Sequence, residues 1–220
     1  MSSLNFDAAR HTMIQSQLRT WDVIDERVLD LAARMPREDF MSPACRNLAY
    51  VDMNIPLEHG EVMMTPKLEA RLLQALEILP SDKILEIGTG SGYLTALLAS
   101  LGRQVVSVEV RPEFTAQAAA KLAHHGLHNI TLEVGDGASG WDRQQPYDVI
   151  VITGSLPILP ETFQQSLTPG GRMIAIVGQA PAMEVVRIRR RDAYTFARDS
   201  LLETSLPPLQ NAAAPSRFLF

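Results

Sequence analysis

The chain has 220 residues, of which 46% are hydrophobic and 20% are charged, and this balance is typical of one α/β-sized unit with a substantial core. Its net charge of −5 lacks the strong positive field on which non-specific binding of nucleic acids or anionic membranes depends, so neither is expected as a partner. A single cysteine, Cys45, excludes an internal disulfide. With no signal-peptide pattern at the N-terminus, this favours a soluble, cytoplasmic protein.

Residues 1–80 are predicted to form a helical extension that also carries the lip of the substrate site. Apolar residues recur at helical spacing between Met13 and Ala32, with breaks at Asp22 and Pro36. Apolar residues between Leu68 and Ile78 predict a further helix over residues 67–79, which ends before Pro80. The remaining residues, 81–220, are predicted to form the core, and the two parts together one compact unit.

The core alternates short apolar runs with helical stretches, which is typical of βαβ units and a parallel sheet. Strands are predicted over residues 83–87, 104–110, 130–134, 148–153 and 172–177, and helices over residues 93–101, 112–125 and 160–167. Two further strand-like runs, 184–189 and 193–202, predict an antiparallel hairpin at the end of the chain. The expected fold class is therefore α/β, a doubly wound, mostly parallel, Rossmann-like sheet with the helical extension before it.

A glycine-rich loop follows the first predicted strand of the core. Gly88, Gly90 and Gly92 stand between that strand and a helix, where a missing side chain lets the backbone approach a ligand. Glu109 ends the next strand, near the ~20-residue offset at which a carboxylate binds ribose hydroxyls in nucleotide folds. The G-x-G-x-G spacing lacks the third glycine of a dinucleotide site, so a nicotinamide cofactor is disfavoured. A plain strand-to-helix turn without a ligand is the alternative.

Two aspartates strengthen the ligand hypothesis. Asp136 follows the third predicted strand, where its carboxylate can accept from an adenine amino group. Asp148 opens the fourth strand beside the glycine loop. Each has an ordinary explanation as a turn or strand-start residue, but the four features in this order favour a nucleoside site.

With these motifs the chain resembles the protein-L-isoaspartate O-methyltransferase family of class I S-adenosylmethionine-dependent methyltransferases. Residues 85–93 resemble its methyl-donor loop, residues 135–141 its adenine-contacting turn, and residues 13–19, 35–40 and 48–50 its helical extension. The resemblance implies S-adenosylmethionine as cofactor and methylation of isoaspartyl residues in proteins or peptides. It also implies the cofactor-binding residues Glu86, Gly88, Thr89, Gly90, Gly92, Glu109, Val110, Asp136 and Gly137.

The chain departs from the family in the segment that reads Gly-Gln-Thr-Ile-Ser-x-Pro in its members. Met64 stands at the position of the serine that lines the reaction site, and Thr65 is the next hydroxyl. No residue is therefore assigned as catalytic, and Met64→Ser is expected to raise a slow isoaspartyl reaction. The predicted substrate lip consists of His59, Val62, Met63, Met64 and Thr65.

Two alternatives remain open at this stage. The adaptable methionine side chains favour a more apolar small-molecule acceptor on the same scaffold. A protein that binds S-adenosylmethionine without catalysis is the second alternative. No metal site is expected at His124 and His125, because histidines at a helix end interact favourably with the helix dipole. The sequence does not define the oligomeric state or the role of the last fifteen residues.

Overall fold

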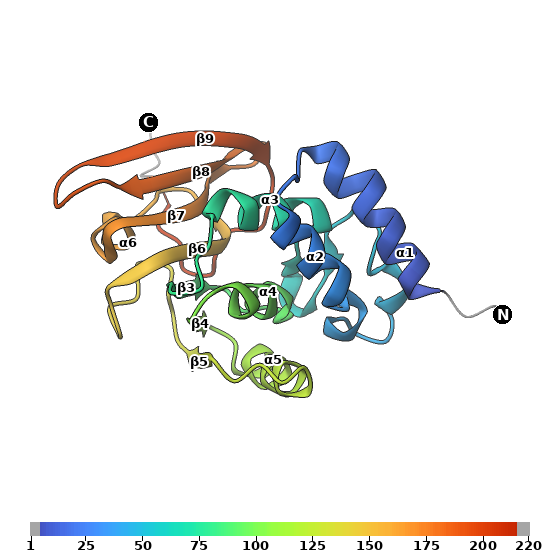
Figure 1. Cartoon of the computed structure of the whole chain (residues 1–220). Helices are drawn as coiled ribbons and strands as arrows, with labels where there is room; N and C mark the ends of the chain where they lie inside the picture. Colours follow the sequence, from blue (N-terminus) through green and yellow to red (C-terminus); the bar gives the residue numbers. More distant parts are fainter. Residues whose placement is uncertain (1–4, 215–220) are drawn as a thin grey trace.

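A computed structural model describes residues 5–214 of the chain as a seven-stranded sheet with helices on its two faces (Figure 1). The strand order is β5-β4-β3-β6-β7-β8-β9, in which β3 to β7 run parallel and β8 and β9 are antiparallel. The strands of this sheet are β3 (Lys83–Ile87), β4 (Gln104–Glu109), β5 (Ile130–Val134), β6 (Tyr147–Leu156), β7 (Leu167–Gln179), β8 (Ala182–Arg190) and β9 (Phe196–Thr204). The predicted fold class and the C-terminal hairpin are confirmed.

The helices divide between the two faces as a doubly wound sheet requires. The main helices are α1 (Phe6–Met13), α2 (Glu26–Arg34), α3 (Pro66–Leu76), α4 (Tyr93–Leu101), α5 (Pro112–His124) and α6 (Glu161–Gln165). Buried side chains of α2, α3, α4 and α5 belong to one core cluster, and Phe163 of α6 belongs to the cluster on the opposite face. Strands β1 (Ile55–Pro56) and β2 (Val62–Met63) pair separately in the extension.

Strand β6 shows why the central strands read as unbroken apolar runs. Val149 and Val151 pack in the first cluster and Ile150 and Ile152 in the second, and all four are fully buried. Successive side chains of a strand point to opposite faces, and both faces of this sheet are covered. Its core therefore needs apolar residues at every position.

The extension follows its sequence signals closely. The break expected at Asp22 is a left-handed residue (φ 57°) that ends a 3₁₀ turn over Arg19–Trp21, after a π-helical turn over Ile14–Leu18. The helix predicted over 67–79 begins at Pro66, because the Thr65 side chain accepts a hydrogen bond from the backbone of Leu68 and caps it. It ends at Leu76, earlier than predicted, because Glu77 is left-handed (φ 49°). In the core, the helix predicted over 160–167 is α6, which spans only Glu161–Gln165, because β7 begins at Leu167.

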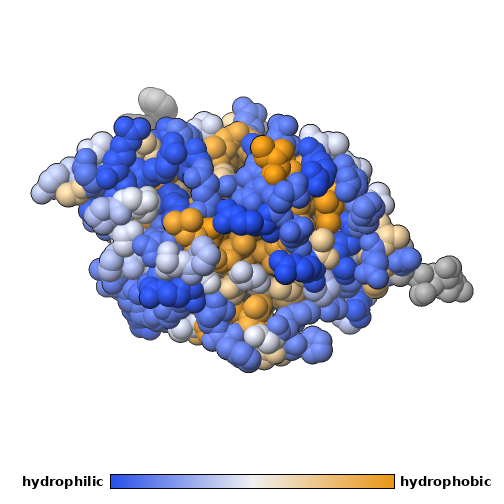
Figure 2. Space-filling view, in the orientation of Figure 1, coloured by the Kyte–Doolittle hydropathy of each residue, from blue (hydrophilic) through white to orange (hydrophobic). Residues whose placement is uncertain are grey.

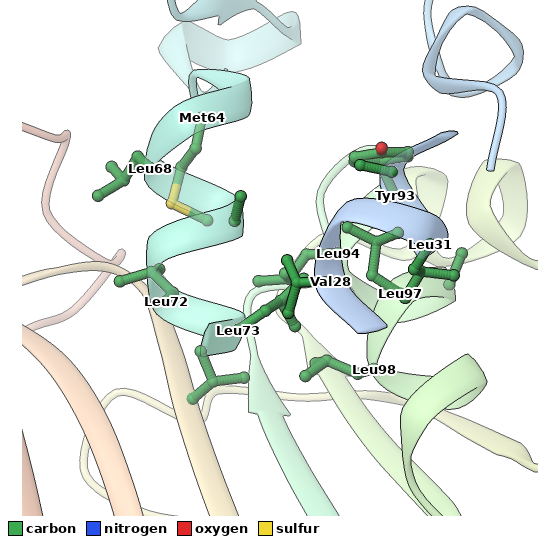
Figure 3. Close-up of a cluster of buried hydrophobic side chains, with 14 of the residues drawn as sticks. Val28, Leu31, Met64, Leu68, Leu72, Leu73, Tyr93, Leu94, Leu97 and Leu98 are labelled. Atoms are coloured by element: carbon green, nitrogen blue, oxygen red, sulfur yellow. The ribbon is translucent and has the colours of Figure 1, made fainter. Parts of the chain in front are cut away.

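Apolar side chains join the extension to the glycine-loop helix. Val28 of α2, Leu73 of α3 and Leu97 of α4 lie together in the buried cluster that Figure 3 shows. The face of the molecule in Figure 2 is mostly hydrophilic, with apolar side chains gathered in patches. Within residues 5–214, no helix combines the length and apolar character needed to cross a bilayer.

A buried ion pair reinforces this junction. The guanidinium of Arg37 donates to the carboxylate of Glu69 on α3 and to the carbonyl of Met64, and the two charged side chains are 1% and 3% exposed. The Arg37 guanidinium also lies over the ring of Tyr93, the first residue of α4, with 4.9 Å between its carbon and the ring centre. One cation therefore contacts α3, the chain before α3 and the start of α4.

Removing one partner of this pair leaves the other charge buried without compensation. We expect Glu69→Leu to lower the free energy of unfolding by about 3–5 kcal/mol, measured by urea denaturation. The double variant Arg37→Met/Glu69→Leu should recover more than half of this loss. A loss below about 1 kcal/mol in the single variant, as for a surface pair, would show that the ion pair is not a structural junction.

Candidate functional site

A crevice opens at the carboxyl ends of β3, β4 and β6, where the strand order reverses. Ligands of open α/β sheets bind at such a switch point. Its walls come from the loop before α3, the glycine loop, the turns after β4 and β5, the end of β6 and the segment after β9. The residues that line it are Leu57, Glu61, Val62, Ile87, Gly88, Gly90, Val108, Glu109, Val110, Phe114, Gly135, Asp136, Gly137, Ala138, Thr153, Gly154, Pro207, Leu209 and Gln210.

Gly88 directly follows β3 and lies close against both neighbouring strands, β4 and β6. Its N–H donates to the carbonyl of Val108 (2.8 Å), and its own carbonyl accepts from the Thr153 hydroxyl (2.8 Å). A Cβ added at Gly88 would lie 2.2 Å from the Thr153 oxygen, and the φ of +98° is unfavourable for other residues. Only glycine fits here, and its backbone forms the floor of the crevice.

Glu109 presents a fixed carboxylate at the end of β4. It is 6% exposed, and its two oxygens accept from the N–H groups of Gly90 (2.9 Å) and Arg111 (3.0 Å). Each carboxylate oxygen can accept a second hydrogen bond. Glu109 can therefore bind a pair of neighbouring hydroxyl groups, as on a ribose.

Asp136 and Gly137 form the opposite wall, after β5. One oxygen of Asp136 accepts from the N–H of Ala138 (3.0 Å). Gly137 packs against β3 so closely that a Cβ there would lie 2.9 Å from the Ile87 side chain. The turn thus lies against the sheet, and Asp136 lines the crevice.

Six of the predicted cofactor-binding residues line the crevice together: Gly88, Gly90, Glu109, Val110, Asp136 and Gly137. Gly92 does not; it precedes α4 as its N-cap with φ +84°, and a Cβ added there would lie 3.0 Å from the Ala118 side chain. Glu86 and Thr89 do not line it either, and both are buried. Glu86, Thr89 and Gly92 therefore support the glycine loop from the side that faces away from the crevice.

Glu86 is the centre of a buried hydrogen-bond network under that loop. Its Oε2 accepts from the hydroxyls of Thr95 (2.5 Å) and Ser107 (2.6 Å), and Ser107 accepts from Thr89 (2.6 Å). Its Oε1 is buried and has no hydrogen-bond partner among residues 5–214. Burial away from water raises the pKa of Glu86 to about 8, so the carboxyl is mostly protonated at neutral pH.

The predicted substrate lip divides between crevice and core. Val62 lines the crevice, whereas Met63 and Met64 are 3% and 4% exposed, and Figure 3 shows the Met64 side chain beside Leu68 of α3. Met63 also lines a neighbouring cavity of about 500 Å³. The methionines therefore do not form an exposed lip, and Thr65 is occupied as the cap of α3.

His59 lies on the loop that closes the crevice from the side of the extension. Its Nε2 is 2.8 Å from the carboxylate of Glu113 at the start of α5, and its backbone is left-handed (φ 59°). On the same loop, Glu61 pairs with Arg111 (3.5 Å). These two contacts tie the loop to α5, so His59 holds the wall of the crevice rather than lining it.

Sequence reasoning missed the wall that follows β9. Leu209 packs on Gly154, where an added Cβ would lie 2.7 Å from its side chain, and its N–H donates to the carbonyl of Ser155 (2.9 Å). Pro207 and Gln210 line the crevice beside it. The one signal in the sequence was a glycine, Gly154, inside an apolar strand, which marks a close approach by another part of the chain.

The comparisons with known proteins show which family the chain belongs to. The sequence model of the family described as "Protein-L-isoaspartate(D-aspartate) O-methyltransferase (PCMT)" matches residues 9–213. The chain belongs to this family. A protein-L-isoaspartate O-methyltransferase of Koribacter versatilis is 38% identical over 204 residues, covering 93% of this chain and 91% of the relative. One of Protochlamydia amoebophila is 35% identical, covering 90% and 94%.

Solved structures give the same fold. A protein-L-isoaspartate O-methyltransferase matches with a TM-score of 0.79 and 25% identity, over 93% of this chain and 67% of that one. A putative family member from Plasmodium falciparum, solved with S-adenosyl-L-homocysteine, matches with a TM-score of 0.76 at 18% identity, over 94% and 99%. The protein is thus an S-adenosylmethionine-dependent methyltransferase of the isoaspartate family.

The crevice fits the adenosyl part of such a cofactor. The backbone at Gly88 and Gly90 can approach a ligand without side chains in the way. Glu109 has acceptor capacity for two ribose hydroxyls, and Asp136 has it for an amino group. Among the described residues, no group of three or more His, Cys, Asp or Glu side chains is placed to hold a metal ion.

The raised pKa of Glu86 predicts a pH dependence of stability. The unfolded chain releases the proton of Glu86 above about pH 4.5, whereas the folded protein keeps it to about pH 8, so this residue's contribution to stability falls as pH rises through that window. Glu86→Gln keeps the neutral form. We expect the free energy of unfolding of this variant, relative to wild type, to rise by more than about 1.4 kcal/mol between pH 5 and 8.

Glu203→Gln, on the exposed side of β9, is the control and should give no such trend. The measurement is chemical denaturation at several pH values. A pH-independent difference between wild type and Glu86→Gln would mean that Glu86 is ionised in the folded protein.

Proposed function

We propose that this protein transfers the methyl group of S-adenosylmethionine to the side-chain carboxylate of isoaspartyl residues in proteins or peptides. The observation that carries the proposal is the crevice itself, in which Gly88, Glu109 and Asp136 converge from three strand ends. The relatives that share its length are named for this activity. The acceptor is the part of the proposal that needs a direct test.

Methyl transfer to a carboxylate requires neither a general acid nor a general base. A carboxylate acceptor is already ionised at pH 7, so no proton has to be removed before it attacks. The cofactor, when bound, supplies an electrophilic methyl group on a sulfonium sulfur; one C–O bond forms, one C–S bond breaks, and a neutral thioether leaves. The residues of this chain then have to bind, align and exclude water, which is worth up to ~7–11 kcal/mol in well-oriented reactions.

This requirement explains how the reaction can proceed without the family's serine. Arg37 donates a hydrogen bond to the main-chain carbonyl of Met64, and Thr65 caps α3 directly after it. The backbone of this segment is therefore fixed, although residue 64 lacks the serine hydroxyl. A fixed backbone beside Val62 can still position an acceptor. Because the side chain at position 64 points into the core of this chain, a serine there would add little to that alignment.

The test is methyl transfer from labelled S-adenosylmethionine to a peptide with one isoaspartyl residue. The same peptide with a normal aspartyl residue is the control for the substrate, and Glu109→Ala is the control for the enzyme. We expect label only in the isoaspartyl peptide, base-labile as a methyl ester, and a loss of at least ten-fold in Glu109→Ala. Equal labelling of both peptides, or of neither, would refute the proposed acceptor.

A methyltransferase for an apolar small-molecule acceptor is the second candidate. The cavity of about 500 Å³ that adjoins the crevice favours it, because Phe40, Ile55, Met63 and Phe114 contribute apolar walls. Labelled transfer to phenolic acceptors, with no transfer to the isoaspartyl peptide, would select this function. Transfer to the peptide alone would exclude it.

The burial of Met64 predicts the outcome of restoring the family's serine. The sequence alone led us to expect a faster reaction in Met64→Ser. The side chain points into the core, so the variant should instead lose about 2–5 kcal/mol of unfolding free energy and gain less than three-fold in turnover. Met64→Leu, which conserves volume, should change both quantities little. A ten-fold rise in turnover in Met64→Ser, measured where both proteins are folded, would show that residue 64 faces the acceptor.

A further inference from the structure

We propose that Asn211 is a positioning residue for recognition of the cofactor's base. Its side-chain amide holds the carboxylate of Asp136 in the crevice, and through that carboxylate it favours a base with an exocyclic amino group. The inference rests on the proposed function in one respect, that the crevice binds an adenosyl cofactor. It does not depend on the methyl acceptor.

The carboxylate of Asp136 is held at both oxygens. One accepts from the backbone of Ala138 (3.0 Å), and the other accepts from the side-chain amide of Asn211 (2.9 Å). Within residues 5–214, Asn211 is the one side chain that donates a hydrogen bond to Asp136. Asp136 and Asn211 are both exposed, and the two hydrogen bonds come from different parts of the chain, so together they orient the carboxylate before a ligand arrives.

Asn211 is brought to Asp136 by a segment that is well anchored. The carbonyl of Pro207 accepts from Ser155 N–H (2.9 Å), and Leu209 N–H donates back to Ser155 (2.9 Å). The side chain of Leu209 lies on the glycines of β6 and the loop after β3. The contact between Asn211 and Asp136 therefore joins two walls of the same crevice.

The chemistry of the carboxylate gives this contact a consequence for specificity. Each carboxylate oxygen has two lone pairs, so the oxygen bound to Asn211 can still accept one further N–H. An adenine amino group is such a donor. A hypoxanthine base presents a carbonyl oxygen at the same place, and a carboxylate repels this oxygen. Holding Asp136 in position therefore strengthens the binding of adenine but not of hypoxanthine.

Variants at position 211 must respect the backbone. Asn211 has φ 64°, the left-handed region, in which alanine is strained. Asn211→Gly removes the amide without that strain. Asn211→Asp keeps the shape but places a second carboxylate against Asp136. Asn211→Gly therefore reports the loss of the hydrogen-bond donor, and Asn211→Asp reports the loss of the donor with the side-chain shape kept and a repelling charge added.

The experiment is calorimetric titration of each protein with S-adenosylhomocysteine and with S-inosylhomocysteine, which differ in the base. We expect Asn211→Gly to bind the adenosyl compound about five-fold more weakly, the value of one hydrogen bond, and Asn211→Asp more weakly still. Affinity for the inosyl compound should change less than two-fold in Asn211→Gly. Thermal unfolding of each variant checks that the fold is kept.

Two results would overturn the role of Asn211 alone. Equal losses for the two ligands would make the segment a wall without a role in base recognition, and no loss for either ligand would make the contact irrelevant to binding. Failure of the wild type to bind either compound would overturn the proposed function as well.

Discussion

The site depends on how closely the main chain at Gly88 approaches its two neighbours. The strand β3 ends between β4 and β6, and Gly88 is hydrogen-bonded to Val108 on one side and to Thr153 on the other. This is also the point where the strand order reverses, so helices diverge to opposite faces and leave a crevice above the strand ends. A side chain at Gly88 would collide with Thr153 and fill the floor of that crevice.

Two buried polar networks hold the walls around this floor. Glu86, Ser107 and Thr89 support the glycine loop from below, and Arg37 joins the segment at Met64 to α3 and to Tyr93 at the start of α4. The side chains of neither network line the crevice. They support the glycine loop and the segment that follows Val62, and both Val62 and the glycine loop line the crevice. Such support suits a reaction in which alignment of the reactants provides most of the catalysis.

The segment after β9 adds a wall that belongs to no regular element. Its main chain bonds to Ser155, Leu209 covers two glycines, and the side-chain amide of Asn211 donates to Asp136. The crevice is therefore assembled from the extension, the sheet and the end of the described chain. Residues 215–220, part of the tail whose role the sequence left open, lie outside the described residues.

The sequence predicted the sheet well, because strands covered on both faces, such as β6, must be apolar at every position. It predicted the crevice residues that carry local signals, such as Gly88, Glu109 and Asp136. It misjudged Glu86, which precedes the glycine loop but points away from the crevice, because neighbouring side chains of a strand alternate and Ile87 faces the ligand side. Contacts between distant segments, such as Leu209 with Gly154, leave almost no local pattern.

The most direct measurement is calorimetric titration of the protein with S-adenosylmethionine, comparing wild type with Gly88→Ala. Gly170→Ala is the matched control, because Gly170 also has a positive φ (+83°) but has open space around it and does not line the crevice. The account predicts micromolar or tighter binding by wild type and by the control, and no detectable binding by Gly88→Ala. Absence of saturable binding by wild type at millimolar cofactor, or unchanged binding by folded Gly88→Ala, would contradict it.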